Sequence, residues 1–390
     1  MKIHNKRVVG FWLGMLWLGF TLLSCSGSDN PAVQRALRAR RSRGPIIIGA
    51  AAPWSEKNNL LAEGIKLAVT EINNKGGVLN RQLKLVFADD KASVTTGQLV
   101  AQQFADNPDI IAVIGHSYGY ISEPVSILYE YYGLLMLSPL SSTPKLTKRG
   151  FKHIFRNIPD DFAYGIDLAH LCTRHGKKRV IICQIKNEFG TGLANAFENE
   201  CLTNNIKIVD RFAYNSASDM TEIKKRLSFW QENYKFDTIF LAAEMPAAAE
   251  IVRCARSLGI DTLILGSNRM YNHNFLQMAG NAAEGVIIPS IFHPEIDLPS
   301  TIDFVDSFKA RYGQIPDYAA EQGYDAVNIL AQAIEAAKTT EPVKIAASMH
   351  SSSKWQGVTG PYSFDSNGNV KSRNIFFTEV KNGQFSLLPE

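Results

Sequence analysis

Residues 45–90 read PIIIGAAAPWSEKNNLLAEGIKLAVTEINNKGGVLNRQLKLVFADD and place one amphipathic segment between two short apolar runs. The runs, 46–51 and 83–88, have the length and composition of buried strands. Between them, residues 60–74 repeat apolar side chains at helical spacing and end at Gly76-Gly77, as helices commonly do. Uninterrupted apolar strands joined by an amphipathic helix are typical of a parallel sheet that is covered on both faces.

The same alternation continues along most of the chain. Further strands are expected at 110–114, 134–137, 179–184, 207–212, 238–241, 263–265 and 285–289, and further helices at 95–106, 123–132, 163–173, 191–204, 221–234, 247–258, 300–312 and 319–337. Residues 357–388 instead alternate polar and apolar side chains around two Asn-Gly turns, which predicts antiparallel strands.

The 390 residues exceed what one hydrophobic core normally organises. We therefore predict an α/β fold of two doubly wound parallel-sheet lobes joined by three crossings near residues 158, 289 and 356. Lobe I is expected to comprise 45–158 plus 289–356, and lobe II 159–288 plus 357–390.

The first 24 residues predict an export signal. Lys2, Lys6 and Arg7 precede an uncharged apolar run that ends in Leu22-Leu23-Ser24-Cys25. This ending resembles a bacterial lipobox, and the resemblance implies a lipid on Cys25. An uncleaved single-span anchor is the alternative, since 17 apolar residues approach the length of a membrane span. Both interpretations export the remainder and place it at the bacterial cell envelope.

Residues 25–44 carry a net charge of +4 and lack apolar periodicity, which predicts a basic, flexible tether. With +3 on residues 1–24, the remaining body carries −3, so a nucleic-acid partner is not expected. Cys183 and Cys254 fall within expected core elements. Export would permit a disulfide between Cys172 and Cys201, but the sequence leaves that pairing open.

Several motifs resemble the type I periplasmic binding proteins of the branched-chain amino-acid (Leu/Ile/Val) kind. They occur in family order, namely INNKGGVLNR (72–81), ADD (88–90), SP (138–139), FRN (155–157), FGTGL (189–193), GYDA (323–326), GVTG (357–360) and FD (364–365). The resemblance implies a solute receptor of an ABC importer, whose partners are a membrane permease and a small carboxylate ligand, most simply an amino acid. No cofactor, metal or catalytic residue is implied.

The physical chemistry of the predicted fold agrees with that use. Ligands of doubly wound sheets bind beyond the carboxyl ends of the strands, where helix N-termini offer free N–H groups to anions. Two lobes joined by hinges can close on such a ligand. Carried over position by position, the family's ligand site corresponds to Trp54, Gly119, Ser141, Ser142, Phe189 and Asn268. We add Tyr118 as a further wall residue, Tyr318 at the mouth, and Glu244, which follows the strand at 238–241 toward the same cleft.

Two of these positions depart from the amino-acid pattern. Gly119 stands where the family usually has a serine, so only the backbone donor remains. Asn268 stands where amino-acid binders usually have an acid for the ligand's ammonium. Either Glu244 supplies the missing anion, or the ligand has no ammonium and is a carboxylic acid or an amide. A solvated Glu244 that caps the following helix is a further interpretation.

Two other functions use different features. Gly115-x-Ser117-x-Gly119 follows a strand and precedes a helix, the context of a serine-esterase nucleophile. Asp297 with His350, or Asp261 with His293, would complete its triad, but no oxyanion segment precedes the motif. A ligand sensor that reports to a membrane receptor is the other alternative. Residues 170–175 contain two histidines and one cysteine in a single helical segment, without a second cluster of metal-ligand residue types, so no metal site is predicted there.

Overall fold

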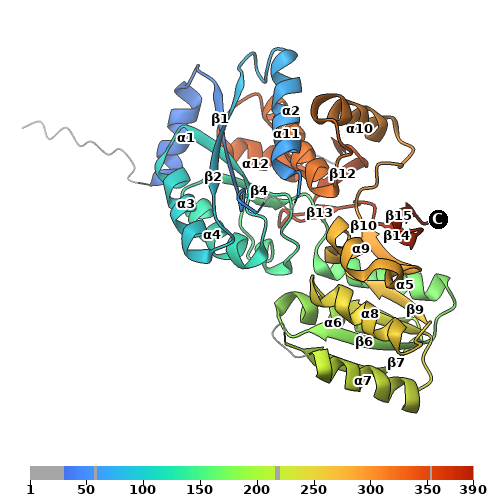
Figure 1. Cartoon of the computed structure of the whole chain (residues 1–390). Helices are drawn as coiled ribbons and strands as arrows, with labels where there is room; N and C mark the ends of the chain where they lie inside the picture. The colour runs from blue at the N-terminus through green and yellow to red at the C-terminus, as the bar shows by residue number, and fades with distance from the viewer. Residues whose placement is uncertain (1–29, 57–58, 216–219, 352–353, 390) are drawn as a thin grey trace, which may run out of the picture.

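The computed structural model describes residues 30–56, 59–215, 220–351 and 354–389, which form two α/β lobes (Figure 1). Lobe I contains a parallel sheet of order β2-β1-β3-β4-β5. Its strands are β1 (Ile46–Ala52), β2 (Leu83–Asp89), β3 (Ile110–Gly115), β4 (Leu135–Ser138) and β5 (Ile154–Arg156). The predicted fold class is confirmed by this sheet and its counterpart in lobe II.

Helices cover both faces of the lobe I sheet because alternate strand residues point to opposite sides. Ala112 and Ile114 face a core shared with α2 (Leu61–Asn74), α11 (Tyr318–Ala337) and α12 (Pro342–Ser351). Val113, between them, faces the core formed with α3 (Val94–Asp106) and α4 (Gly119–Tyr131). Helix α10 (Pro299–Tyr312) packs beside α2 through the apolar side chains of Leu67 and Phe308.

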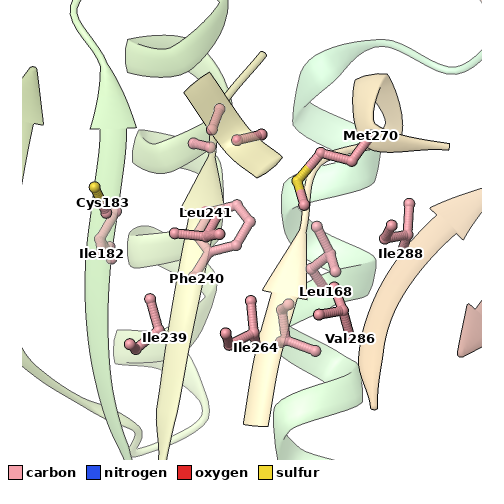
Figure 2. Packing of buried hydrophobic residues seen from close by; sticks show 14 of the residues in the cluster. Leu168, Ile182, Cys183, Ile239, Phe240, Leu241, Ile264, Met270, Val286 and Ile288 are labelled. Carbon is pink, nitrogen blue, oxygen red and sulfur yellow. The ribbon is translucent and has the colours of Figure 1, made fainter. Parts of the chain in front are cut away.

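Lobe II is built on a seven-stranded sheet of order β15-β14-β10-β9-β8-β6-β7. The parallel strands are β6 (Arg179–Ile185), β7 (Lys207–Tyr214), β8 (Thr238–Ala242), β9 (Leu263–Gly266) and β10 (Val286–Ser290). Its helices are α5 (Asp161–Arg174), α6 (Glu188–Thr203), α7 (Met220–Asn233), α8 (Ala247–Ser257) and α9 (His273–Ala279). Figure 2 shows its buried core, in which Ile182, Phe240 and Ile264 lie on successive strands beside Leu168 of α5.

The chain crosses between the lobes three times, but the third crossing lies later than predicted. It runs from β13 (Val370–Lys371) to β14 (Phe376–Lys381), which continues to β15 (Gln384–Leu387) in lobe II. The preceding sheet of β11 (Trp355–Gly357), β12 (Gly360–Phe364) and β13 packs into the lobe I core through its aromatic side chains. Assigning 357–371 to lobe II is therefore wrong, as is assigning 289–290, within β10, to lobe I.

A glycine turn fixes the small sheet against β5. Gly368 has a φ of +81°, and a Cβ there would lie 2.1 Å from the carbonyl oxygen of Ile154. Its own carbonyl accepts from the N–H of Arg156 at 3.0 Å. The turn that alternating polarity placed in lobe II thus joins lobe I because its backbone reaches the edge of that sheet.

The tether prediction is wrong for residues 31–41, which form helix α1 (Pro31–Arg41) on lobe I. Asn30 caps the helix, accepting from the Ala32 N–H at 2.9 Å. Arg35 is 1% exposed and donates to the main-chain carbonyls of Tyr132, Asn107, Ile110 and Ala105. Burial lowers the pKa of Arg35 to about 10, so its guanidinium stays charged at neutral pH. Cys25 and the predicted signal lie outside the described residues.

Cys172 and Cys201 are buried free thiols, and burial raises the pKa of Cys172 to about 12. Among the helices of the described residues, none has the length and apolarity needed to cross a bilayer.

Candidate functional site

The predicted site residues from both sheets lie where parallel strands end, the edge at which such sheets bind ligands. In lobe I they follow three strands, with Trp54 after β1, Tyr118 and Gly119 after β3, and Ser141 and Ser142 after β4. In lobe II, Phe189 follows β6, Glu244 follows β8 and Asn268 follows β9. Tyr318 begins α11, which follows α10 in the part of lobe I that comes after the second crossing.

The N-terminus of α4 is open to an anion. Tyr118 occupies the N-cap position without a side-chain hydrogen bond to the helix, so the first N–H groups lack an intrahelical acceptor. A Cβ on Gly119 would lie 3.6 Å from Ser141 Oγ, which places this hydroxyl beside the helix end. That Oγ is buried and has no hydrogen-bond partner among the described residues. Free N–H groups beside an unsatisfied hydroxyl are suited to a carboxylate.

Thr143 explains why glycine stands at position 119. A Cβ there would lie 2.9 Å from Cγ2 of Thr143 and 3.0 Å from its Cβ. The space that a serine side chain would need is therefore already filled. The missing hydroxyl is visible in the sequence, whereas the neighbour that occupies its place is visible only in the fold.

Asp161, the first residue of α5, supplies a buried carboxylate between the lobes. Its main-chain N–H donates to the Ser142 carbonyl at 3.1 Å, which joins lobe II to lobe I. Its side chain is 3% exposed, and Oδ1 has no hydrogen-bond partner in the described part of the chain. Burial raises the pKa of Asp161 to about 6, although Arg269 and the Ser142 hydroxyl favour ionisation.

Glu244 is engaged within lobe II. One carboxylate oxygen forms an ion pair with Arg269, and the other accepts from Asn187 Nδ2 at 3.2 Å. It is neither a free anion for an ammonium nor a solvated cap. Asn268 Oδ1, in contrast, is buried and lacks a partner among the described residues.

An aromatic and cationic wall completes the lobe II side. The guanidinium carbon of Arg269 lies 3.7 Å from the ring centroid of Phe189, which is 6% exposed. Burial lowers the pKa of Arg269, while Asp161 and Tyr318 act in the opposite direction. Burial also raises the pKa of Tyr318 to about 12, which keeps its phenol neutral.

Trp54 and Tyr118 belong to the lobe I wall. The indole N–H of Trp54 donates to the Ala88 carbonyl at 2.9 Å, and its ring meets Phe87 edge-on at 5.1 Å. The Tyr118 hydroxyl donates to Glu56 at 2.9 Å, and its ring stacks on that of Tyr120. These hydrogen bonds and ring contacts join Trp54 and Tyr118 to other residues of lobe I.

Comparison with known proteins identifies the family. The model of the periplasmic binding protein family matches residues 49–384. The chain belongs to the periplasmic binding protein family.

Named relatives of this periplasmic binding protein come from several bacteria. It is 26% identical over 382 residues to a leucine-, isoleucine-, valine-, threonine- and alanine-binding protein of Pseudomonas aeruginosa, covering 97% of this chain and 96% of the relative. A substrate-binding protein of Desulfitobacterium hafniense, solved in complex with leucine, is 39% identical, with a TM-score of 0.81 and coverage of 88% and 100%. A leucine-binding protein of Thermotoga maritima is 26% identical, with a TM-score of 0.78 and coverage of 88% and 98%.

The esterase motif of this periplasmic binding protein lacks a base. His116 uses both ring nitrogens, at 2.7 Å from Asp90 Oδ2 and 3.1 Å from the Tyr129 hydroxyl. Ser117 Oγ is buried without a partner among the described residues. His293 and His350 contact main-chain carbonyls elsewhere, so neither proposed triad forms. The motif instead shapes the loop that presents Gly119.

Two charged residues of this binding protein escaped the sequence analysis, and both follow recognised motifs. Asp161 comes four residues after Asn157, at the end of the first crossing, and Arg269 directly follows Asn268. The sequence contained a signal for both residues, because Asp161 is a charged residue at a crossing and Arg269 is a charged residue beside an expected ligand position. No group of three or more potential metal-ligating side chains occurs within the described residues.

Proposed function

We propose that this chain is a solute receptor that binds an amino acid with an uncharged side chain between its lobes and delivers it to an ABC importer. One observation carries the proposal, namely that Asp161, a buried carboxylate of lobe II, is hydrogen-bonded through its main chain to Ser142, next to the Ser141 hydroxyl that lies beside the N-terminus of α4. The ligand carboxylate binds the N-terminus of α4 and the Ser141 hydroxyl. The ligand ammonium donates to Asp161 Oδ1 and Asn268 Oδ1, which otherwise remain unsatisfied.

The proposal differs from both alternatives that the sequence left open. Because Glu244 is held by Arg269 and Asn187, it is not needed as the ammonium anchor. Asp161 takes that place, so an amino acid remains the best ligand despite Asn268. The leucine in the Desulfitobacterium hafniense complex and the aliphatic amino acids in the relatives' names support the same ligand class.

Calorimetry with leucine and its deaminated analogue tests this proposal. We expect L-leucine to bind, and 4-methylpentanoic acid, which lacks the ammonium, to bind at least tenfold more weakly, since a charge-assisted hydrogen bond is lost. Equal affinity for the two compounds would contradict an ammonium anchor. Absence of binding by any amino acid would contradict the receptor function itself.

The proposed site of action is outside the cytoplasmic membrane, as the family assignment supports. The finer proposal is a lipid on Cys25, based on the basic residues and the apolar run that end in the lipobox-like Leu22-Leu23-Ser24-Cys25. Metabolic labelling with an alkynyl fatty acid tests it. We expect label on the wild-type protein and none on Cys25→Ala, whereas an uncleaved span would leave both proteins unlabelled and membrane-bound.

The receptor proposal assigns no bond chemistry to Ser117. A fluorophosphonate probe reports on an activated serine, and we expect no stoichiometric labelling of this residue because none of the described histidines is placed to take its proton. Labelling at Ser117 would revive the esterase alternative.

A further inference from the structure

Arg269 and Glu244 form an ion pair at the lobe II end of the proposed ligand site. Both residues follow adjacent strands, β9 and β8, at the edge where ligands bind. Arg269 Nη1 donates to Glu244 Oε1, and the guanidinium lies over the Phe189 ring. The side chains are 35% and 24% exposed, so the pair is partly accessible to solvent.

The hydrogen bonding of this arginine is incomplete. Arg35 and Arg156 are buried arginines that use Nε, Nη1 and Nη2 as donors. Within the part of the chain that the structure describes, Arg269 has an acceptor only at Nη1. Guanidinium groups favour two parallel hydrogen bonds to a carboxylate, so Arg269 retains donors for a second acceptor.

Glu244, in contrast, has both oxygens engaged, by Arg269 and by Asn187. The negative charge of Glu244 neutralises the positive charge of Arg269 at the lobe II end of the proposed ligand site. In the proposed site, the side chain of a ligand held by α4 and Asp161 points toward Phe189 and toward the Arg269 guanidinium that covers the Phe189 ring. The ligand side chain therefore meets an aromatic ring and a neutralised cation.

We propose that the Arg269–Glu244 pair sets the charge selectivity of the site: Glu244 neutralises Arg269 and so excludes acidic side chains, which Arg269 would otherwise bind. This inference rests on the proposed amino-acid receptor function and extends it to the side-chain class. An acidic ligand that used the remaining donors of Arg269 would bring its carboxylate beside that of Glu244 in a partly desolvated place, where the two negative charges repel each other. Without the Glu244 charge, the side-chain carboxylate of glutamate or aspartate takes its position on Arg269.

The test compares L-leucine and L-glutamate by calorimetry with Glu244→Gln. Gln keeps the size of the side chain and removes its charge. We expect the ratio of glutamate to leucine affinity to rise at least tenfold over the wild-type ratio, as gaining a charge-assisted contact requires. The double variant Glu244→Gln with Arg269→Gln is expected to lose this gain, because no cation remains.

Glu198→Gln is the matched control. Glu198 pairs with Arg211 in the same lobe, where neither residue belongs to the proposed site. The ratio of glutamate to leucine affinity in Glu198→Gln should equal the wild-type ratio. Circular dichroism and thermal unfolding establish that each variant is folded, and Glu244→Ser replaces Glu244→Gln if the latter does not fold.

The outcomes separate the two proposals. An unchanged ratio in folded Glu244→Gln, or an equal gain in the double variant, overturns the selectivity inference while leucine binding preserves the receptor function. Wild-type protein that binds glutamate as tightly as leucine also overturns the inference. Wild-type protein that binds no amino acid overturns the receptor function instead.

Discussion

The main-chain N–H of Asp161 donates to the carbonyl of Ser142 at 3.1 Å, which connects the first helix of lobe II to the last ligand loop of lobe I. The contact positions a buried carboxylate beside the loop that carries Ser141. Asp161, at the end of the first crossing, thus belongs to the proposed ligand site as well as to the connection between the lobes.

Asp161→Asn should separate binding from stability. The amide keeps the shape of the side chain but loses the charge that attracts an ammonium, so leucine affinity should fall at least tenfold. The ligand-free protein should unfold at a higher temperature at pH 7.5, because an ionised carboxylate is no longer buried. Calorimetry measures the affinity, and thermal unfolding without ligand measures the stability. A stabilised variant that binds leucine like the wild type would remove Asp161 from the ligand site.

Leucine binding should depend on pH through the same carboxylate. Burial raises the pKa of Asp161 from 3.8 to about 6 in the ligand-free protein. Below that pH the carboxyl is protonated, so leucine affinity should decline between pH 7.5 and 5. The stability of the ligand-free protein should change with pH in the direction opposite to the leucine affinity. The folded state binds this proton more tightly than the unfolded state, so the Asp161 contribution to stability decreases as pH rises from about 4 to 6.

Calorimetry and thermal unfolding across this pH range check both signs. Asp161→Asn is the control, since it should flatten the dependence of each quantity. A wild-type leucine affinity that is constant from pH 7.5 to 5 would assign the ammonium to another partner.

Restoring a serine at position 119 should weaken leucine binding. The new Cβ would lie 2.9 Å from Cγ2 of Thr143, so Gly119→Ser forces a shift in the loop that presents the carboxylate donors. Overpacking of this kind costs about 1–3 kcal/mol. Adding Thr143→Ala makes room for the hydroxyl, and the double variant should bind leucine more tightly than Gly119→Ser alone. Dissociation constants from calorimetry decide the order, and the reverse order would refute the packing explanation.

Arg35→Ala should loosen α1 from lobe I. The substitution leaves four main-chain carbonyls without their donor, and an unsatisfied buried acceptor costs about 1–3 kcal/mol. Chemical denaturation should show a loss of this order, and limited proteolysis should cut residues 31–41 sooner. Arg38→Ala is the control. Its ion pair with Asp109 is exposed, and such pairs contribute little to stability because solvent screens them. Equal effects of the two substitutions would contradict the anchoring role of Arg35.

The alternation of apolar runs and amphipathic helices predicted the sheets because it is a local property of the chain. Helix α1 lacks that pattern, since its deepest contact comes from the guanidinium of Arg35 and not from an apolar stripe. A buried arginine on main-chain carbonyls is indistinguishable in sequence from a solvated one. Expectations of a flexible, basic segment therefore failed where tertiary hydrogen bonds decide the structure.

The candidate site was predictable where it depends on strand ends and less so where it depends on pairs. Ser141 and Gly119 follow strands, and their loops lie together because neighbouring parallel strands end at one edge. The pairing of Glu244 with Arg269 depends on two loops separated by 24 residues and on the rotamers of both side chains. The third crossing was misplaced for a similar reason, because alternating polarity identifies strands but not the sheet edge that they reach.

The docking of α1 changes how far the receptor can travel from a lipidated Cys25. A free segment of residues 26–44 could span roughly 65 Å, whereas residues 26–30, which precede the helix, reach at most about 18 Å. Helix α1 and lobe I would then stay close to the bilayer surface. The receptor would reach its permease by lateral diffusion along that surface. This short tether would raise the local concentration of the receptor at the importer and would restrict the orientations in which the two proteins can bind each other.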